Sequence, residues 1–178
     1  MELLADLFTT VDGFARGERS PAYFGYLGPE LERWIDEELA KPQGLLLGRV
    51  TYELFSAMSN EGYDNRMDAL PKFVVSTTLS EPLSWNARLL DSIEKVRELK
   101  SEEGPPLRCM GSLSLVRSLL ANGLLDRLRL VVFPQILGET GREPFLAGLP
   151  DIDLELAEQR VLDRRLVLLD YRPLKRRA

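Results

Sequence analysis

The sequence contains no histidine and only one cysteine, Cys109. Without histidine, no Ser-His-Asp triad or Cys-His pair can form, and the usual zinc ligand sets are missing. A single cysteine excludes an intramolecular disulfide and fits a reducing compartment. We interpret Cys109 as a small hydrophobic residue inside a strand. We therefore predict no metal site. Catalysis would depend on other polar groups or on an organic cofactor, and a nicotinamide suits this inventory because the cofactor carries the difficult chemistry.

Long apolar runs are also missing. No stretch approaches the ~20 residues that span a bilayer, and the N-terminal MELLADLF has two acids and no positive segment, unlike a signal peptide. The net charge of −5 argues against a broad surface for nucleic acid or anionic membrane. A local cationic pocket for one small anion stays compatible with that charge. We expect a cytoplasmic protein with no nucleic-acid or membrane partner.

The composition is that of a globular protein, with 178 residues, of which 44% are hydrophobic and 29% charged. We predict one domain spanning residues 1–178. Apolar periodicity and turn signals predict strands at 2–9, 44–48, 72–77, 88–91, 106–110, 125–137, 153–163 and 164–174, and helices at 29–39, 50–58, 92–100 and 113–121. Residues 17–29 and 138–150 are predicted to be irregular connections.

The order of these elements indicates the fold class. GLLLG is a short continuous apolar run, typical of a strand covered on both faces in a parallel sheet. Helices alternate with strands until residue 123, and three strands follow without a helix. We therefore predict an α/β fold in which helices cover a mostly parallel sheet, with antiparallel strands at its C-terminal side.

Three predicted strands end in the same way, with a small or hydroxylated residue before a helix or loop. The carboxyl ends of strands bind ligands in open α/β sheets. Side by side, these junctions would offer backbone N–H groups, hydroxyls and one guanidinium to a phosphorylated dinucleotide, with Arg49 on its 2′-phosphate or pyrophosphate. The alternatives are ordinary helix caps and a surface pair between Arg49 and Glu53. No GxGxxG motif occurs. The junctions are Gly48-Arg49-Val50-Thr51, Ser76-Thr77-Thr78 and Gly111-Ser112-Leu113.

An ordered set of segments resembles the dihydrofolate reductase superfamily. The resemblance is nearest to the reductase domain of the riboflavin-biosynthesis deaminase–reductase and its stand-alone relatives. It implies a three-layer fold with helices on both faces, NADPH as hydride donor, a homodimer, and reduction of a pterin, aminopyrimidine or related heterocyclic or carbonyl substrate, as in a dihydrofolate or phosphoribosylaminouracil reductase. The segments are TTVDGFA (9–15), LLLGRVTYELF (45–55), PKFVVSTTL (71–79) and MGSLSLVRSLLANGLLDRLRLVVFPQILG (110–138).

The resemblance also implies which residues bind the cofactor. Those in the matching motifs are Thr10, Gly48, Arg49, Thr51, Ser76, Thr77, Thr78, Gly111, Ser112 and Leu113. Met110 departs from the Gly-Gly doublet of the classical folate enzymes.

The sequence leaves open which group supplies a proton to the reduced substrate. Without histidine, the source must be water or a carboxyl group. Asp12 is the first candidate, since enclosure by Tyr23, Phe24 and Tyr26 would raise its pKa; the alternative is an Asx turn at Asp12-Gly13. In the folate reductases a carboxylate on the helix before the Gly-Arg motif holds the pterin. The corresponding candidates here are Glu32 and Asp36. The helix also carries Glu30, Glu37 and Glu38, and we interpret most of its acids as a solvated face.

A second hypothesis comes from another class of protein, a non-catalytic reductase-like dimer that binds a nucleotide or serves regulation. A flavin-using reductase is a third. In either class, we predict that the C-terminal strands, within 125–137 and 153–171, form or border a homodimer interface, because an exposed apolar edge needs to be covered.

Overall fold

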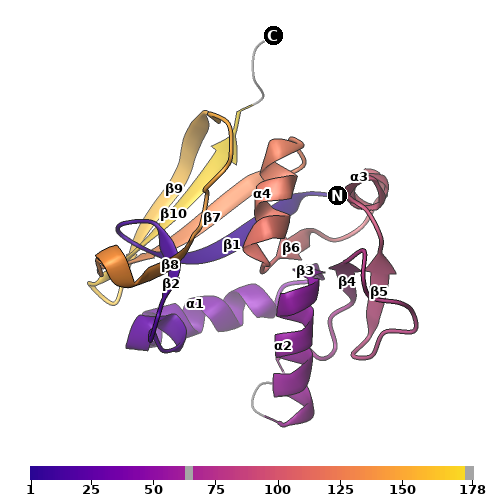
Figure 1. The fold of residues 1–178 in the computed structure, drawn as a ribbon, viewed down its shortest axis with the longest axis horizontal. Helices are drawn as coiled ribbons and strands as arrows, with labels where there is room; N and C mark the ends of the chain where they lie inside the picture. The colour runs from indigo at the N-terminus through magenta and orange to yellow at the C-terminus, as the bar shows by residue number, and fades with distance from the viewer. Residues whose placement is uncertain (63–65, 175–178) are drawn as a thin grey trace.

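The computed structural model describes residues 1–62 and 66–174, and its centre is an eight-stranded sheet (Figure 1). The strand order is β5-β4-β3-β6-β1-β7-β10-β9. The first six strands in this order pair in parallel, whereas β10 is antiparallel to both β7 and β9. The predicted α/β fold, with antiparallel strands on the C-terminal side, is confirmed.

The elements follow the predicted order closely. Ser92 caps the third helix by accepting the Lys95 N–H, and the fourth helix ends at Asn122, followed by Gly123 at a φ of 61°. The elements are β1 (Leu3–Thr10), β2 (Phe14–Gly17), α1 (Pro29–Leu39), β3 (Gly44–Gly48), α2 (Arg49–Asn60), β4 (Lys72–Val75), β5 (Ala87–Leu90), α3 (Ile93–Ser101), β6 (Leu107–Cys109), α4 (Leu113–Ala121), β7 (Arg127–Phe133), β8 (Gly141–Pro144), β9 (Leu154–Leu162) and β10 (Leu166–Pro173), with 3-10 turns at Ala22–Gly25 and Gly138–Thr140.

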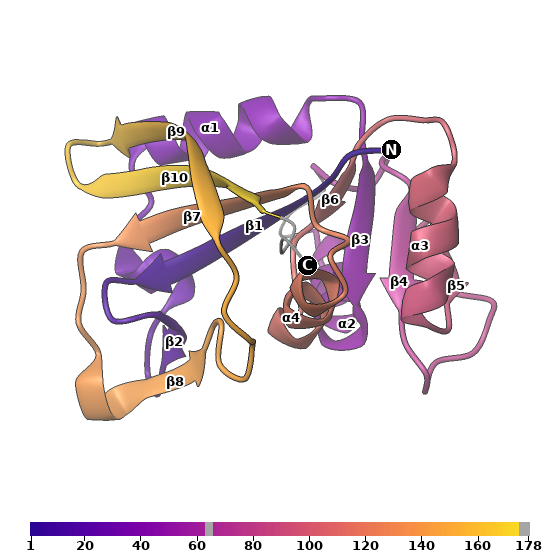
Figure 2. The ribbon, with the colours of Figure 1, turned by 90° about the horizontal axis from the view of Figure 1, so that it is seen from above.

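Helices cover both faces of the sheet (Figure 2). Side chains of α1 and α2 share one core with Leu45 and Leu47, whereas those of α3 and α4 share the other core with Leu46. Successive strand residues point to opposite faces, so a strand between two helical layers must be apolar at every position. This is why GLLLG is buried throughout. None of the helices in the described ranges has the length and apolar character needed to cross a membrane.

A small second sheet was not predicted. β2 and β8 pair antiparallel, with Phe14 opposite Pro144, inside segments expected to form a turn and an irregular connection. Neither strand has apolar alternation, so no periodic signal marks them. A Cβ on Gly141 would lie 2.5 Å from the Phe14 ring, so this close pairing depends on glycine at that position.

The C-terminal hairpin turns where the sequence predicts, since Asp163 and Arg164 have φ values of 55° and 53°. Its tip also closes α1, whose N-terminus has no cap of its own. The Asp163 carboxylate accepts the N–H groups of Glu30 at 2.8 Å and Leu31 at 3.1 Å. The long β7 predicted over 125–137 is shorter, because it stops before Pro134, which has no N–H to donate.

Candidate active site

The structure brings the three predicted junctions to one edge of the sheet. β4, β3 and β6 are neighbours and run parallel, so their carboxyl ends lie side by side. The segments that follow them line a cavity of about 400 Å³, hereafter the smaller cavity. Its walls include Gly48, Arg49, Ser76, Thr77, Thr78 and Ser112.

Two glycines allow the junctions to pack together. The Gly48 N–H donates to the Gly111 carbonyl at 2.9 Å. A Cβ on Gly48 would lie 2.4 Å from Ser112 Oγ and 2.9 Å from Ser112 N. Gly111 has a φ of 112°, and a Cβ there would lie 3.0 Å from Thr51 Oγ1. The close approach of these two strand ends therefore explains why glycine follows the leucine run at position 48.

The helices that start at this edge have free N-termini. Neither α2 nor α4 has a side-chain cap or an acid in its first turn. By contrast, α3 is capped by Ser92 and carries Glu94 in its first turn. The first N–H groups of α2 and α4 therefore have no side-chain acceptor, and such groups, together with the helix dipole, attract anions.

The sequence left two roles open for Arg49, a contact with a bound anion and a surface pair with Glu53, and the structure is compatible with both. It lines the smaller cavity, and its Nη1 also donates to the two carboxylate oxygens of Glu53 at 3.1 and 3.0 Å. Both side chains are about half exposed, so the pair contributes only about 0.3–0.5 kcal/mol. Asp91 adds a negative charge to the same cavity.

A larger cavity of about 690 Å³ adjoins the first. Val50, Ser112 and Ser114 line both cavities, so the two spaces meet at the starts of α2 and α4. Besides Ser112, the larger cavity is lined by three more predicted cofactor residues, Thr51, Gly111 and Leu113. Its walls are otherwise largely aromatic and aliphatic, and include Phe8, Tyr23, Ile35, Val50, Phe55 and Met110.

Asp12 does not sit in an apolar enclosure. Its Oδ1 accepts the Thr10 hydroxyl at 2.6 Å, and its Oδ2 accepts the N–H groups of Leu137 and Gly138 at 2.9 and 2.8 Å. The hydrogen bond from Thr10, followed by that from Gly138, lowers the pKa of Asp12. The predicted rise in this pKa is therefore wrong, and the geometry is that of a clamp between two loops.

The three aromatic residues expected to enclose Asp12 lie in three different environments in the structure. Tyr23 lines the larger cavity. Phe24 is buried and packs against Phe133 with ring centroids 5.0 Å apart. Tyr26 stacks with Arg165 at 4.5 Å.

The helix acids also lie away from the larger cavity. Glu32 is exposed and lines neither cavity. Asp36 accepts a hydrogen bond from Arg66 at 2.7 Å. Thr10 likewise lines neither cavity.

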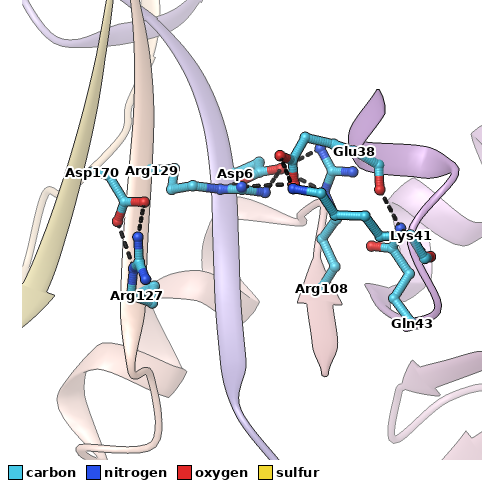
Figure 3. Close-up of polar contacts among 8 residues, drawn as sticks. All are labelled: Asp6, Glu38, Lys41, Gln43, Arg108, Arg127, Arg129 and Asp170. Carbon is cyan, nitrogen blue, oxygen red and sulfur yellow. Dashed lines mark hydrogen bonds and ion pairs between the residues drawn. The ribbon is translucent and has the colours of Figure 1, made fainter. Parts of the chain in front are cut away.

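A buried row of charges was missed by sequence reasoning (Figure 3). Asp6 on β1 lies between Arg108 on β6 and Arg129 on β7, all under α1. Glu38, expected to be solvated, accepts a hydrogen bond from Arg129 at 2.8 Å. Asp6 and Arg108 line the larger cavity.

The neighbours of Glu38 and Arg129 favour the charged forms of these two groups. Burial opposes the charge of Glu38, but hydrogen bonds from Lys41 and Arg129 outweigh it and lower its pKa. Burial likewise opposes the charge of Arg129, but Asp6 and Glu38 raise its pKa. Such pairs are costly to break, because removal of one partner leaves a buried charge.

Cys109 is fully buried, and burial raises the pKa of its thiol to about 12. The interpretation of Cys109 as a core residue is consistent with this environment. In residues 1–62 and 66–174, no group of three or more histidine, cysteine, aspartate or glutamate side chains could hold a metal ion.

Comparisons with known proteins agree with this geometry. The chain is 26% identical to the uncharacterized protein YyaP of Bacillus subtilis, over 95% of this chain and 93% of that protein. Its fold resembles a pyrimidine reductase-like protein from Corynebacterium diphtheriae, with a TM-score of 0.70 and 13% identity over 98% and 92% of the two chains. It also resembles dihydrofolate reductase from Enterococcus faecalis complexed with NADP(H), with a TM-score of 0.68 and 13% identity over 98% and 97%. The family model of the RibD C-terminal domain matches residues 2–168. The chain therefore belongs to the RibD C-terminal domain family, whose fold it shares with the dihydrofolate reductases.

Proposed function

We propose that this protein is an NADPH-dependent reductase that transfers a hydride to a small heterocyclic or carbonyl substrate, such as a pterin or an aminopyrimidine. The observation that carries the proposal is the pair of adjoining cavities. One is lined by hydroxyls, helix N-termini and Arg49. The other is largely apolar. A dinucleotide has the matching order of parts, with phosphates at one end and a nicotinamide at the other.

The residues of the smaller cavity fit the phosphates of such a cofactor. The free N–H groups of α2 and α4 face it, and Ser76, Thr77 and Thr78 add hydroxyls. Arg49 supplies a charge for the 2′-phosphate, at the expense of its weak pair with Glu53. When bound, NADPH would supply the hydride. The apolar walls of the larger cavity would exclude water from the reacting face.

NADH is the competing candidate for the cofactor, because Asp91 also lines the smaller cavity. A carboxylate in this position can accept hydrogen bonds from ribose hydroxyls, whereas a 2′-phosphate prefers a guanidinium. Titration of the protein with each cofactor, followed by nicotinamide fluorescence, compares the two directly. A lower Kd for NADPH supports the proposal, and equal curves contradict it.

We propose water as the source of the proton. Asp12, Glu32 and Asp36 all lie outside the walls of both cavities. The same observation favours the second hypothesis, a non-catalytic nucleotide-binding or regulatory dimer. Oxidation of NADPH in the presence of dihydrofolate, other pterins and aminopyrimidine ribitol compounds separates the two. Turnover with any of these supports a reductase, and cofactor binding without turnover supports the regulatory dimer.

We also propose a homodimer built on β9. This strand is the edge of the sheet and is exposed along most of its length. Leu162, Leu166 and Leu168 join the core under α1, so the cross-strand pair Val161 and Val167 points to the opposite face. Both are exposed. An apolar edge of this kind needs a cover, and light scattering at twice the 20.2 kDa chain mass is the expected result.

A further inference from the structure

Arg108, in the wall of the larger cavity, carries a donor for which the described residues provide no hydrogen-bond partner. Arg108 is 2% exposed and lines this cavity. Its Nη1 is buried and has no hydrogen-bond partner. Buried polar atoms nearly always have a partner, and a charged group is costly to leave unpaired. This nitrogen therefore indicates where a ligand can supply the missing acceptor.

The hydrogen bonds around Asp6 show why Arg108 has capacity to spare. Arg129 takes Asp6 in a two-point contact, with Nε on Oδ1 at 2.6 Å and Nη2 on Oδ2 at 2.8 Å, and it also holds Glu38. Arg108 contacts only one oxygen of Asp6: its Nε donates to Oδ2 at 2.5 Å, and its Nη2 forms an ion pair with the same oxygen. Arg129 is therefore neutralised by two carboxylates, Asp6 and Glu38, whereas Arg108 pairs, among the described residues, only with Asp6 and shares that carboxylate with Arg129.

The guanidinium of Arg108 is also held in place. Trp34 of α1 lies against both guanidinium groups, with its ring centroid 5.8 Å from Arg108 Cζ and 5.3 Å from Arg129 Cζ. Asp6 fixes the other edge of Arg108. The donor is therefore oriented before any ligand arrives, which lowers the entropic cost of binding.

We propose that Arg108 is a substrate-binding residue, whose Nη1 donates to a carbonyl or carboxylate oxygen at the buried end of the substrate. The assignment of the larger cavity to a substrate rests on the proposed function. Asp6, the carboxylate beside Arg108, already accepts three arginine hydrogen bonds and forms an ion pair with Arg108 Nη2. Glu143 also lines the cavity, but it is half exposed and pairs with Arg16.

This arrangement favours ligands that present a hydrogen-bond acceptor to Arg108 over ligands that present a donor. Arg108 in the cavity wall has a donor without a partner among the described residues, so a ring bearing carbonyl oxygens would gain a charge-assisted hydrogen bond there. A ring of the same shape bearing amino groups brings donor to donor and leaves Arg108 unpaired, which disfavours it. A merely structural ion pair would not distinguish between these two ligands.

The wild-type protein without NADPH tests this with two probes of equal shape. The probes are uracil and its diamino analogue, in which amino groups replace the two carbonyl oxygens attached to the ring. Each is titrated into the protein and followed by calorimetry. We expect the diamino analogue to bind at least about 10-fold more weakly than uracil. Equal or tighter binding of the analogue overturns the proposal, as does undetectable binding of uracil. NADPH binding, measured separately by fluorescence, reports on the smaller cavity, so failure of the cofactor assignment is recognised independently.

Two matched variants locate the effect. Arg108→Lys keeps a charge beside Asp6 but removes Nη1, and we expect uracil to bind about 10- to 100-fold more weakly. Arg127→Lys makes the same change at an arginine that pairs with Asp170 and lies outside the cavity, and it leaves uracil binding unchanged. Unchanged uracil binding to Arg108→Lys, or an equal loss in Arg127→Lys, overturns the proposal. If Arg108→Lys does not fold, the two probes on the wild-type protein decide.

A third probe identifies the kind of oxygen. Orotate carries a carboxylate on the uracil ring. Tighter binding of orotate than of uracil assigns Arg108 to an anionic oxygen, and equal or weaker binding assigns it to a neutral carbonyl. Both results support the donor role only when Arg108→Lys removes the affinity of the better probe, and retention of that affinity refutes it.

Discussion

Gly48→Ala is the sharpest test of how the site is built. The new Cβ would lie 2.4 Å from Ser112 Oγ and 2.9 Å from Ser112 N. The hydroxyl can rotate, but the backbone nitrogen cannot move without shifting the start of α4. Gly48 has a φ of −78°, so the conflict is purely one of space. Forced overpacking of this kind costs about 1–3 kcal/mol of folding free energy.

The same displacement should reach the cofactor site, since Gly48 and Ser112 both line the smaller cavity. We expect the NADPH Kd to rise at least about 10-fold, which corresponds to about 1.4 kcal/mol. Urea unfolding followed by tryptophan fluorescence measures the stability, and nicotinamide fluorescence measures the Kd.

Gly44→Ala is the matched control on the same strand. Its Cβ would meet Phe73 Cε2 at 3.0 Å and Leu107 Cδ2 at 3.1 Å, which are ends of side chains that can yield, and Gly44 lies outside both cavities. We expect some loss of stability and an unchanged NADPH Kd. The reasoning is refuted if Gly48→Ala unfolds within about 0.5 kcal/mol of wild type and binds NADPH equally well.

Four further predictions follow from single residues. Arg49→Ala should weaken NADPH binding about 10- to 100-fold and leave NADH binding nearly unchanged; equal losses in the two titrations would contradict the role of Arg49. Asp12→Asn should keep both NADPH binding and turnover, whereas a loss of turnover near 10²-fold would identify Asp12 as the proton donor. Because its folded pKa is lowered from 3.8, wild-type Asp12 stabilises the fold above that pH, and the stabilisation is lost as pH falls through the folded pKa; acid unfolding of Asp12→Asn should show less of this dependence. Cys109, with a pKa near 12, should react with a disulfide reagent only in denaturant, and rapid reaction of the native protein would contradict its burial. Val161→Glu should yield a monomer by light scattering with unchanged NADPH affinity, and a persisting dimer would place the interface elsewhere.

The sequence predicted the elements that build the sheet, because each carries a local signal. GLLLG is apolar throughout since it lies between two helical layers, and Ser92 and Asn122-Gly123 are helix ends with their own stereochemistry. The strand-end hydroxyls gathered as expected, because the ends of neighbouring parallel strands share an edge by topology. Local sequence signals and strand topology together were sufficient to predict that these residues lie around one site, the smaller cavity.

The parts that were missed depend on contacts between distant residues. The capping of α1 by Asp163 joins positions 133 residues apart, and no motif links them. The β2–β8 pair has no apolar alternation to mark it. The alternation of Arg127, Leu128, Arg129 and Leu130 is typical of a strand with one wet face, yet α1 covers the arginine face, and Arg129 is buried there.

The buried charges resolve an apparent conflict between composition and site. The chain carries a net charge of −5, yet each proposed ligand contact is electropositive. At one end the contact comes from helix N-termini and Arg49, and at the other from the partly compensated Arg108. Field near a ligand depends on the closest groups, and burial reduces the screening of Arg108 by solvent. A net charge of −5 argues against an extended anionic partner but is compatible with two local contacts to ligand oxygens. In the proposed reaction the first end holds NADPH and the second holds the substrate, and the hydride would pass between them beside the apolar walls of the larger cavity.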